Sequence, residues 1–468
     1  MSYQSPFTSR YGSPEMRALW SEESKRRAWR RVWAAVAEAQ AAAGLVSPQQ
    51  VDDIRSNASH IDIPRAFEIE AEIGHDLMAE LQTFAEQCPL GGGVLHWGLT
   101  SADVEDNADV VRQKAALALV LAQLRDLLLA FAAQMDATAD LPVMGYTHLQ
   151  PAEPTTFGYR LAMYAQDLLA HFQALARLRV ELRGKGIKGA VGTGAPFAEM
   201  LEGTAVTAEM LEATVMDALG IQAYSITGQT YPRIQDFSLL TRLAGLAGSL
   251  HKFAFDLRLM QSPAIGQASE PFGVKQVGST AMPFKRNPVM SEKVCSLARL
   301  VASGISAAWE NAANTLLERT LDDSANRRVI IPEAFLACDE MLSTAAAIVR
   351  GLEIDRQRAG AALEGFAPFA ATERLLSALV RAGADRQATH ARLREHCLAA
   401  MESVRSGLPN PLPDRLSADT TLLRFLQPGR IRDLLKAESY LGFAPERART
   451  LASEIRERMQ AAPSETSR

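Results

Sequence analysis

Apolar residues recur at helical spacing through most of the chain, and the helices they predict are long. One run alternates spacings of four and three over Leu239, Leu243, Leu246, Leu250, Phe253, Leu257 and Met260. That spacing is typical of a coiled-coil-like seam. A helix from Pro232 to Met260 would be roughly 40 Å long at 1.5 Å per residue. We expect this helix to lie at the centre of the fold.

The same periodicity predicts further helices over about 21–43, 102–138, 156–183, 288–317 and 331–352. Loops rich in glycine and proline separate them, over 145–154, 184–194 and 278–288. Beyond 352 the helical pieces are shorter and broken by proline. The pattern predicts an all-α protein with a helical domain over 1–101, a central long-helix bundle over 102–352 and a C-terminal helical domain over 353–468.

Several of the long helices are apolar on more than one face. A single small bundle cannot cover helices of this length on all sides, so we expect them to pack against copies from other subunits. The pattern therefore favours a homo-oligomer. A long monomeric bundle is the alternative.

Composition narrows the class of protein. The chain has 468 residues, a formal net charge of -5 and 47% hydrophobic residues, which indicates a soluble globular protein without a nucleic-acid or membrane surface. Its four cysteines, Cys88, Cys295, Cys338 and Cys397, have no paired spacing and are interpreted as reduced thiols. We expect a cytoplasmic location.

Candidate chemistry is limited to acid and base groups. No metal-ligand spacing, phosphate-binding loop or nucleophile elbow is present, so we expect neither a metal nor a cofactor. Three histidines, His75, His96 and His148, lie in loop-like settings. His148 stands out because it lies between two breaks that join long helices, where a polar side chain can face a cleft.

The loop Gly278-Ser279-Thr280-Ala281-Met282-Pro283-Phe284-Lys285-Arg286-Asn287-Pro288 resembles the signature of the fumarase/aspartase superfamily, in the form found in adenylosuccinate lyases. Four more segments match in the same order. They are residues 9–16, Gly98-Leu99-Thr100-Ser101, Thr147-His148-Leu149-Gln150-Pro151-Ala152 and residues 318–328, the last in the version of the animal-type enzymes.

The resemblance implies a tetramer-forming, three-domain fold and a β-elimination. Such enzymes release fumarate from adenylosuccinate, giving AMP, and from the succinyl-carboxamide nucleotide SAICAR, giving AICAR. By their places in the motifs, Ser279 is the expected base and His148 the expected acid. Lys285 and Asn287 would hold the succinyl carboxylate.

The remaining expected substrate-binding residues also come from matched positions. The phosphate and ribose end is assigned to Arg10, Tyr11, Arg319, Ser324 and Arg328. Asp76, Thr100, Ser101 and Gln229 match positions around the base and succinyl group, and His75 would help orient or hold the substrate. Two further positions expected to lie at the substrate depart from the family: Gly74 stands where the family usually has arginine, and Lys293 stands where close relatives have arginine. Thr280 replaces the second serine of the loop. Alternative readings are another fumarate-releasing lyase, of the argininosuccinate or aspartate type, and a catalytically silent structural relative.

Overall fold

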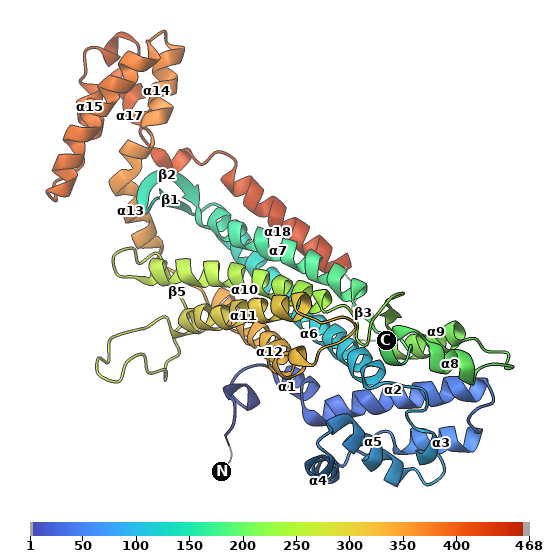
Figure 1. Cartoon of the computed structure of the whole chain (residues 1–468). Helices are drawn as coiled ribbons and strands as arrows, with labels where there is room; N and C mark the ends of the chain where they lie inside the picture. The colour runs from blue at the N-terminus through green and yellow to red at the C-terminus, as the bar shows by residue number, and fades with distance from the viewer. Residues whose placement is uncertain (1–2, 462–468) are drawn as a thin grey trace. The chain divides into compact units, whose positions relative to one another are not determined.

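The computed structural model describes residues 3–461 and is built almost entirely of helices (Figure 1). The expected all-α class is confirmed. The chain forms two compact units, one of residues up to 124, 170–251 and 294–343, the other of 125–169, 252–293 and 344 onward. The predicted three-domain division, whose outermost residues 1–2 and 462–468 lie outside the described range, stays a prediction.

The longest helices contribute residues to both units. They are α6 (Ser101–Ala137), α7 (Phe157–Glu181), α10 (Ile234–Gln261), α11 (Val289–Ala313) and α12 (Asp322–Arg350). The predicted seam of α10 is buried along its whole length, from Leu239 at 0% to Met260 at 7% exposure. The apolar residues that recur along α10 therefore belong to the buried core, as their spacing in the sequence predicted.

The first unit adds shorter helices and a two-residue parallel strand pair. These elements are α1 (Pro14–Leu19), α2 (Glu22–Ala42), α3 (Pro48–Asn57), α4 (Ile63–Ile73), α5 (Asp76–Gln87), α8 (Ala195–Met200), α9 (Ala208–Leu219), β3 (Arg183–Gly184) and β4 (Gln222–Ala223). Glu80 of α5 binds Arg26 and Arg30 of α2 at 2.9 and 2.6 Å, with all three side chains fully buried. This ion triad holds α5 against α2. Two predicted site residues, His75 and Asp76, lie at the N-terminal end of α5.

The second unit contains the hairpin of β1 (Pro142–Thr147) and β2 (Gln150–Thr156), which packs on α13 (Arg356–Ala370) through Met144 and Leu363. Its other elements are β5 (Ala268–Ser269), β6 (Glu353–Ile354), α14 (Thr372–Arg381), α15 (Arg386–Arg405), α16 (Leu412–Ser417), α17 (Pro428–Leu434) and α18 (Ala444–Ala461). Buried leucines of α13 to α17 form the core at the C-terminal end.

Two local predictions were wrong. The segment 145–154 was expected to be a loop and is part of the hairpin, in which Tyr146 lies opposite Pro151 and Thr147 opposite Gln150 in the antiparallel pair. The helix expected to start at 331 begins at Asp322. Pro332 lies inside α12, and the acidic Asp322 and Asp323 are in the first turn of this helix.

By length and composition, α6 could cross a membrane, and no second helix among residues 3–461 meets both criteria. Half of its most apolar stretch is buried within the protein, which is also the property of a core helix. At its N-terminal end Asp103, Asp106 and Asn107 are buried and hydrogen-bonded. We therefore describe α6 as a core helix.

Candidate active site

An open pocket of about 440 Å³ in the first unit brings together many of the predicted substrate-binding residues. Its walls come from the ends of α4, α5, α6 and α12 and from the segment before α10. The predicted residues among its lining are Gly74, His75, Asp76, Ser101, Gln229, Arg319, Ser324 and Arg328. Thr100 adjoins it, since its hydroxyl accepts a hydrogen bond from the Gln229 amide at 2.5 Å.

The turn between α4 and α5 is formed at Gly74, which stands where the family usually has arginine. Gly74 ends α4 with φ +67°, in the left-handed region that favours glycine. His75 then occupies the N-cap of α5, and its Nδ1 faces the backbone N–H of Met78 at 3.5 Å. This geometry presents His75 and Asp76 to the pocket.

Arg328, on the second turn of α12, faces the pocket from the opposite side. Its guanidinium donates to Asp76 at 2.6 Å and lies 3.8 Å from Glu105. Burial raises the pKa of the Asp76 carboxyl, but the hydrogen bond and charge of Arg328 outweigh it and hold the pKa below its ordinary value. Asp76 is therefore ionised at neutral pH and holds Arg328 in place.

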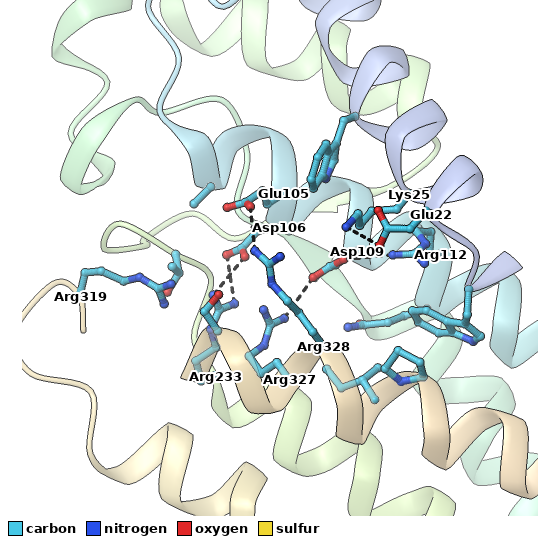
Figure 2. A pocket seen from close by; sticks show the side chains of 18 residues that line it. Glu22, Lys25, Glu105, Asp106, Asp109, Arg112, Arg233, Arg319, Arg327 and Arg328 are labelled. Carbon is cyan, nitrogen blue, oxygen red and sulfur yellow. Dashed lines mark hydrogen bonds and ion pairs between the residues drawn. The ribbon is translucent and has the colours of Figure 1, made fainter. Parts of the chain in front are cut away.

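Arg319 is positioned by a buried network that the sequence did not reveal. It donates to Asp323 at 2.7 Å, and Asp323 accepts from Arg233 at 2.5 Å. Arg233 also binds both oxygens of Asp106, at 3.1 Å each (Figure 2). The guanidinium of Arg319, whose side chain is 25% exposed, is thus held by charged groups that are almost fully buried. The sequence signal that could have revealed this network is a set of acidic residues at helical spacing on α6, which is otherwise largely apolar.

The same network continues along α12. Arg327 donates to Asp236 at 2.7 Å and to the Tyr231 hydroxyl at 2.7 Å, and approaches Asp109 at 3.4 Å. Burial lowers the pKa of a guanidinium, but the surrounding carboxylates outweigh it and raise the pKa of Arg327 well above its ordinary value. Arg327 is a fixed structural cation, whereas its neighbour Arg328 is half exposed and faces the pocket.

The signature loop lies in the second unit, between β5 and α11. The backbone N–H groups of Ala281 and Met282 donate to the Ser279 hydroxyl oxygen at 3.3 and 3.1 Å. The Asn287 amide donates to the carbonyl of Gly278 at 2.8 Å, which ties the two ends of the loop together. Lys285 is exposed. Two donors aimed at one oxygen stabilise negative charge on it, as a serine base requires.

His148 is at the tip of the hairpin. His148 and Leu149 both have positive φ, +53° and +58°, between the paired residues Thr147 and Gln150. This is a two-residue turn of the primed type, and it leaves the imidazole exposed. Among the hydrogen bonds of residues 3–461, none joins His148 to Ser279.

Like the residues of the signature loop and His148, the predicted residues Arg10, Tyr11 and Lys293 do not line the pocket. Arg10 is exposed, and the ring of Tyr11 packs against Phe7 with centroids 5.8 Å apart. Lys293 is half-buried on α11. Conversely, the pocket contains Glu70, Glu105 and Leu321, which the motif comparison did not single out. Within residues 3–461, no group of three or more His, Cys, Asp or Glu side chains is arranged to hold a metal ion.

Comparison with known proteins defines the class. A family model described as lyase matches residues 9–303. The fold is shared with two solved structures, each with a TM-score of 0.84. One is a fumarate lyase from Mesorhizobium sp. BNC1, 23% identical, with 97% of this chain and 100% of that chain covered. The other is a 3-carboxy-cis,cis-muconate lactonizing enzyme from Pseudomonas putida, 25% identical, covering 97% and 99%.

A second model, described as adenylosuccinate lyase C-terminus, matches residues 368–451. Adenylosuccinate lyase from Saccharomyces cerevisiae is 37% identical over 95% of this chain and 93% of its own length. The enzyme from Schistosoma mansoni is 38% identical over 89% and 88%. The chain belongs to the adenylosuccinate lyase family, and the resemblance found in its motifs is confirmed.

Proposed function

We propose that the protein cleaves adenylosuccinate to AMP and fumarate, and SAICAR to AICAR and fumarate. The observation that carries this proposal is the pocket in which two arginines, Arg319 and Arg328, meet His75, Ser101 and Gln229. Guanidinium groups bind phosphate through paired N–H donors, and the polar groups opposite them suit a base and a succinyl group. A substrate without a phosphate has no need of both arginines.

In the proposed reaction, the Ser279 alkoxide takes the proton from the carbon next to a succinyl carboxylate. The electron pair forms the C=C bond of fumarate as the C–N bond breaks, and His148 gives a proton to the leaving nitrogen. The N–H groups of Ala281 and Met282 support the first step because they stabilise charge on the Ser279 oxygen. Lys285 and Asn287 would hold the carboxylate on which negative charge builds up.

We further propose that the active form is a tetramer in which each pocket is completed by segments of other copies. Large apolar side chains on the long helices support this, since Met163, Phe255 and Trp309 are 53%, 53% and 51% exposed. Arg10, Tyr11 and the signature loop would then reach the pocket of a neighbouring copy. The cytoplasmic location expected from the sequence stays a prediction.

The test is an absorbance assay with adenylosuccinate, SAICAR, argininosuccinate and aspartate. We expect turnover of the first two. Ser279→Ala should lower kcat by about 10²–10⁴-fold with little change in KM, because a general base contributes about that factor. The exposed Ser453→Ala on α18 is the matched control. Turnover of argininosuccinate or aspartate alone, or of none of the four, would reject the proposed substrates.

Mixing two inactive variants tests the shared pocket. Ser279→Ala and Arg328→Met should each lose activity alone. If their residues act in one site from different copies, random reassembly of a 1:1 mixture restores about one quarter of the sites. No recovery after confirmed subunit exchange would show that each pocket takes both residues from the same chain.

A further inference from the structure

The proposed nucleotide pocket contains more negative charge than its arginines balance. Deeper in the unit, Asp106 and Asp323 are held by Arg233, while Asp236 is held by Arg327. At the pocket itself, Arg328 alone faces two carboxylates, Asp76 at 2.6 Å and Glu105 at 3.8 Å. The proposed anion-binding pocket therefore has two carboxylates beside a single arginine, one more than that arginine can neutralise.

Of the two carboxylates beside Arg328, Glu105 makes the weaker contact. It lies in the second turn of α6 and lines both this pocket and the adjoining smaller cavity, and 29% of its side chain is exposed. Figure 2 shows its carboxyl group directed toward Arg328, with Asp106 beside it. Asp76 takes the short hydrogen bond of Arg328, so Glu105 has only the 3.8 Å contact.

Its surroundings oppose ionisation. Burial raises the pKa of the Glu105 carboxyl to about 7, and the nearby charges of Asp76, Asp106 and Asp109 act in the same direction against Arg328. The other titratable or charged groups that line the two cavities are Glu22, Lys25, Glu70, His75, Arg112, Arg233, Arg319 and Arg327.

We propose that Glu105 is a proton-linked positioning residue for the phosphate of the nucleotide. Without nucleotide, the Glu105 carboxylate pairs with Arg328. When the phosphate pairs with Arg328, Glu105 takes up a proton from solvent and donates a hydrogen bond where its anion would repel the ligand. This inference rests on the proposed function, because it assumes that the pocket holds a nucleotide phosphate.

The coupling between nucleotide binding and protonation of Glu105 has a definite direction. A phosphate monoester brings a charge of about -1.5 to -2 near Glu105, which raises the pKa of its carboxyl further in the complex. Nucleotide binding should therefore take up a fraction of a proton near pH 7, equal to the fraction of Glu105 that is ionised beforehand. Affinity should fall as pH rises above 7, by up to about tenfold for each unit by which the phosphate raises that pKa.

The experiment is titration calorimetry of AMP and of adenosine into the full-length protein at pH 7. Three buffers with different ionisation enthalpies give the number of protons bound. Wild type is compared with Glu105→Gln and with the exposed Glu202→Gln as matched control. AMP itself releases a small proton fraction because its second phosphate pKa is about 6. The difference between wild type and Glu105→Gln removes that contribution.

We expect proton uptake with AMP in wild type and Glu202→Gln, and its loss in Glu105→Gln. Glu105→Gln should also bind AMP more tightly than wild type at pH 8.5, while adenosine should show no difference. Glu105→Asp, which keeps a carboxyl group, should retain uptake and covers the case in which the glutamine variant misfolds. Equal uptake in wild type and Glu105→Gln, or equal uptake with adenosine, would overturn the inference alone. Absence of AMP binding to wild type would overturn the proposed function as well.

Discussion

Replacing Arg233 should show how far the pocket depends on the buried network beneath it. Arg233 directly precedes α10, and only 3% of its side chain is exposed. It binds Asp106 of α6 through two hydrogen bonds of 3.1 Å and Asp323 of α12 at 2.5 Å. One guanidinium thus joins three helices of the first unit and holds the carboxylate that anchors Arg319.

The variant Arg233→Met keeps the length of the side chain and removes its charge. Asp323 would retain Arg319, but Asp106 would retain only the backbone N–H of Tyr231, at 2.8 Å. Asp106 is 2% exposed, so its charge would be buried without a directly bonded cation. Breaking a buried ion pair in this way costs about 3–5 kcal/mol. For a unit of this size that corresponds to a melting temperature lower by on the order of 10 °C.

Thermal unfolding at pH 8, followed by circular dichroism, is the assay. Asp106→Asn in the same background should recover part of the loss because it removes the unpaired charge. The exposed Arg394→Met is the control.

A melting temperature for Arg233→Met equal to that of Arg394→Met at pH 8 would refute this reasoning. If the network only stabilises the fold, KM for the nucleotide should stay unchanged. We expect KM to rise, because Arg319 loses part of its anchor.

Three further substitutions test other buried groups by urea unfolding. Glu80→Ala leaves two buried arginines of α2 without their carboxylate and should cost about 3–5 kcal/mol, and a cost under 1 kcal/mol would contradict the buried triad. Tyr231→Phe removes the hydroxyl between Asp236 and Arg327 and should cost about 1–3 kcal/mol; an unchanged midpoint would argue against those bonds. Burial raises the pKa of Asp419, but its hydrogen bonds outweigh this and lower it to about 2. Asp419→Asn should therefore lower the free energy of unfolding by about 2 kcal/mol at pH 7. This destabilisation should disappear as pH falls from about 4 to 2, where Asp419 becomes protonated in the wild type. A destabilisation that does not change with pH would contradict this prediction.

The long helices and the family could both be predicted from patterns along the chain. Apolar period marks a buried face directly, and the seam from Leu239 to Met260 is buried as that rule requires. The motif around Ser279 identified the family because its residue types recur in a fixed order. Both kinds of signal are local, so they can be read along the chain.

The side chains that hold the pocket arginines depend on how distant helices pack together. The contacts from Asp106 to Arg233 and from Arg328 to Asp76 join residues 127 and 252 positions apart. No local pattern encodes such pairings, because they depend on how helix ends meet. The hairpin carrying His148 and the start of α12 at Asp322 were missed for the same reason: proline marks a break in the sequence, whereas pairing and packing decide what the backbone does there.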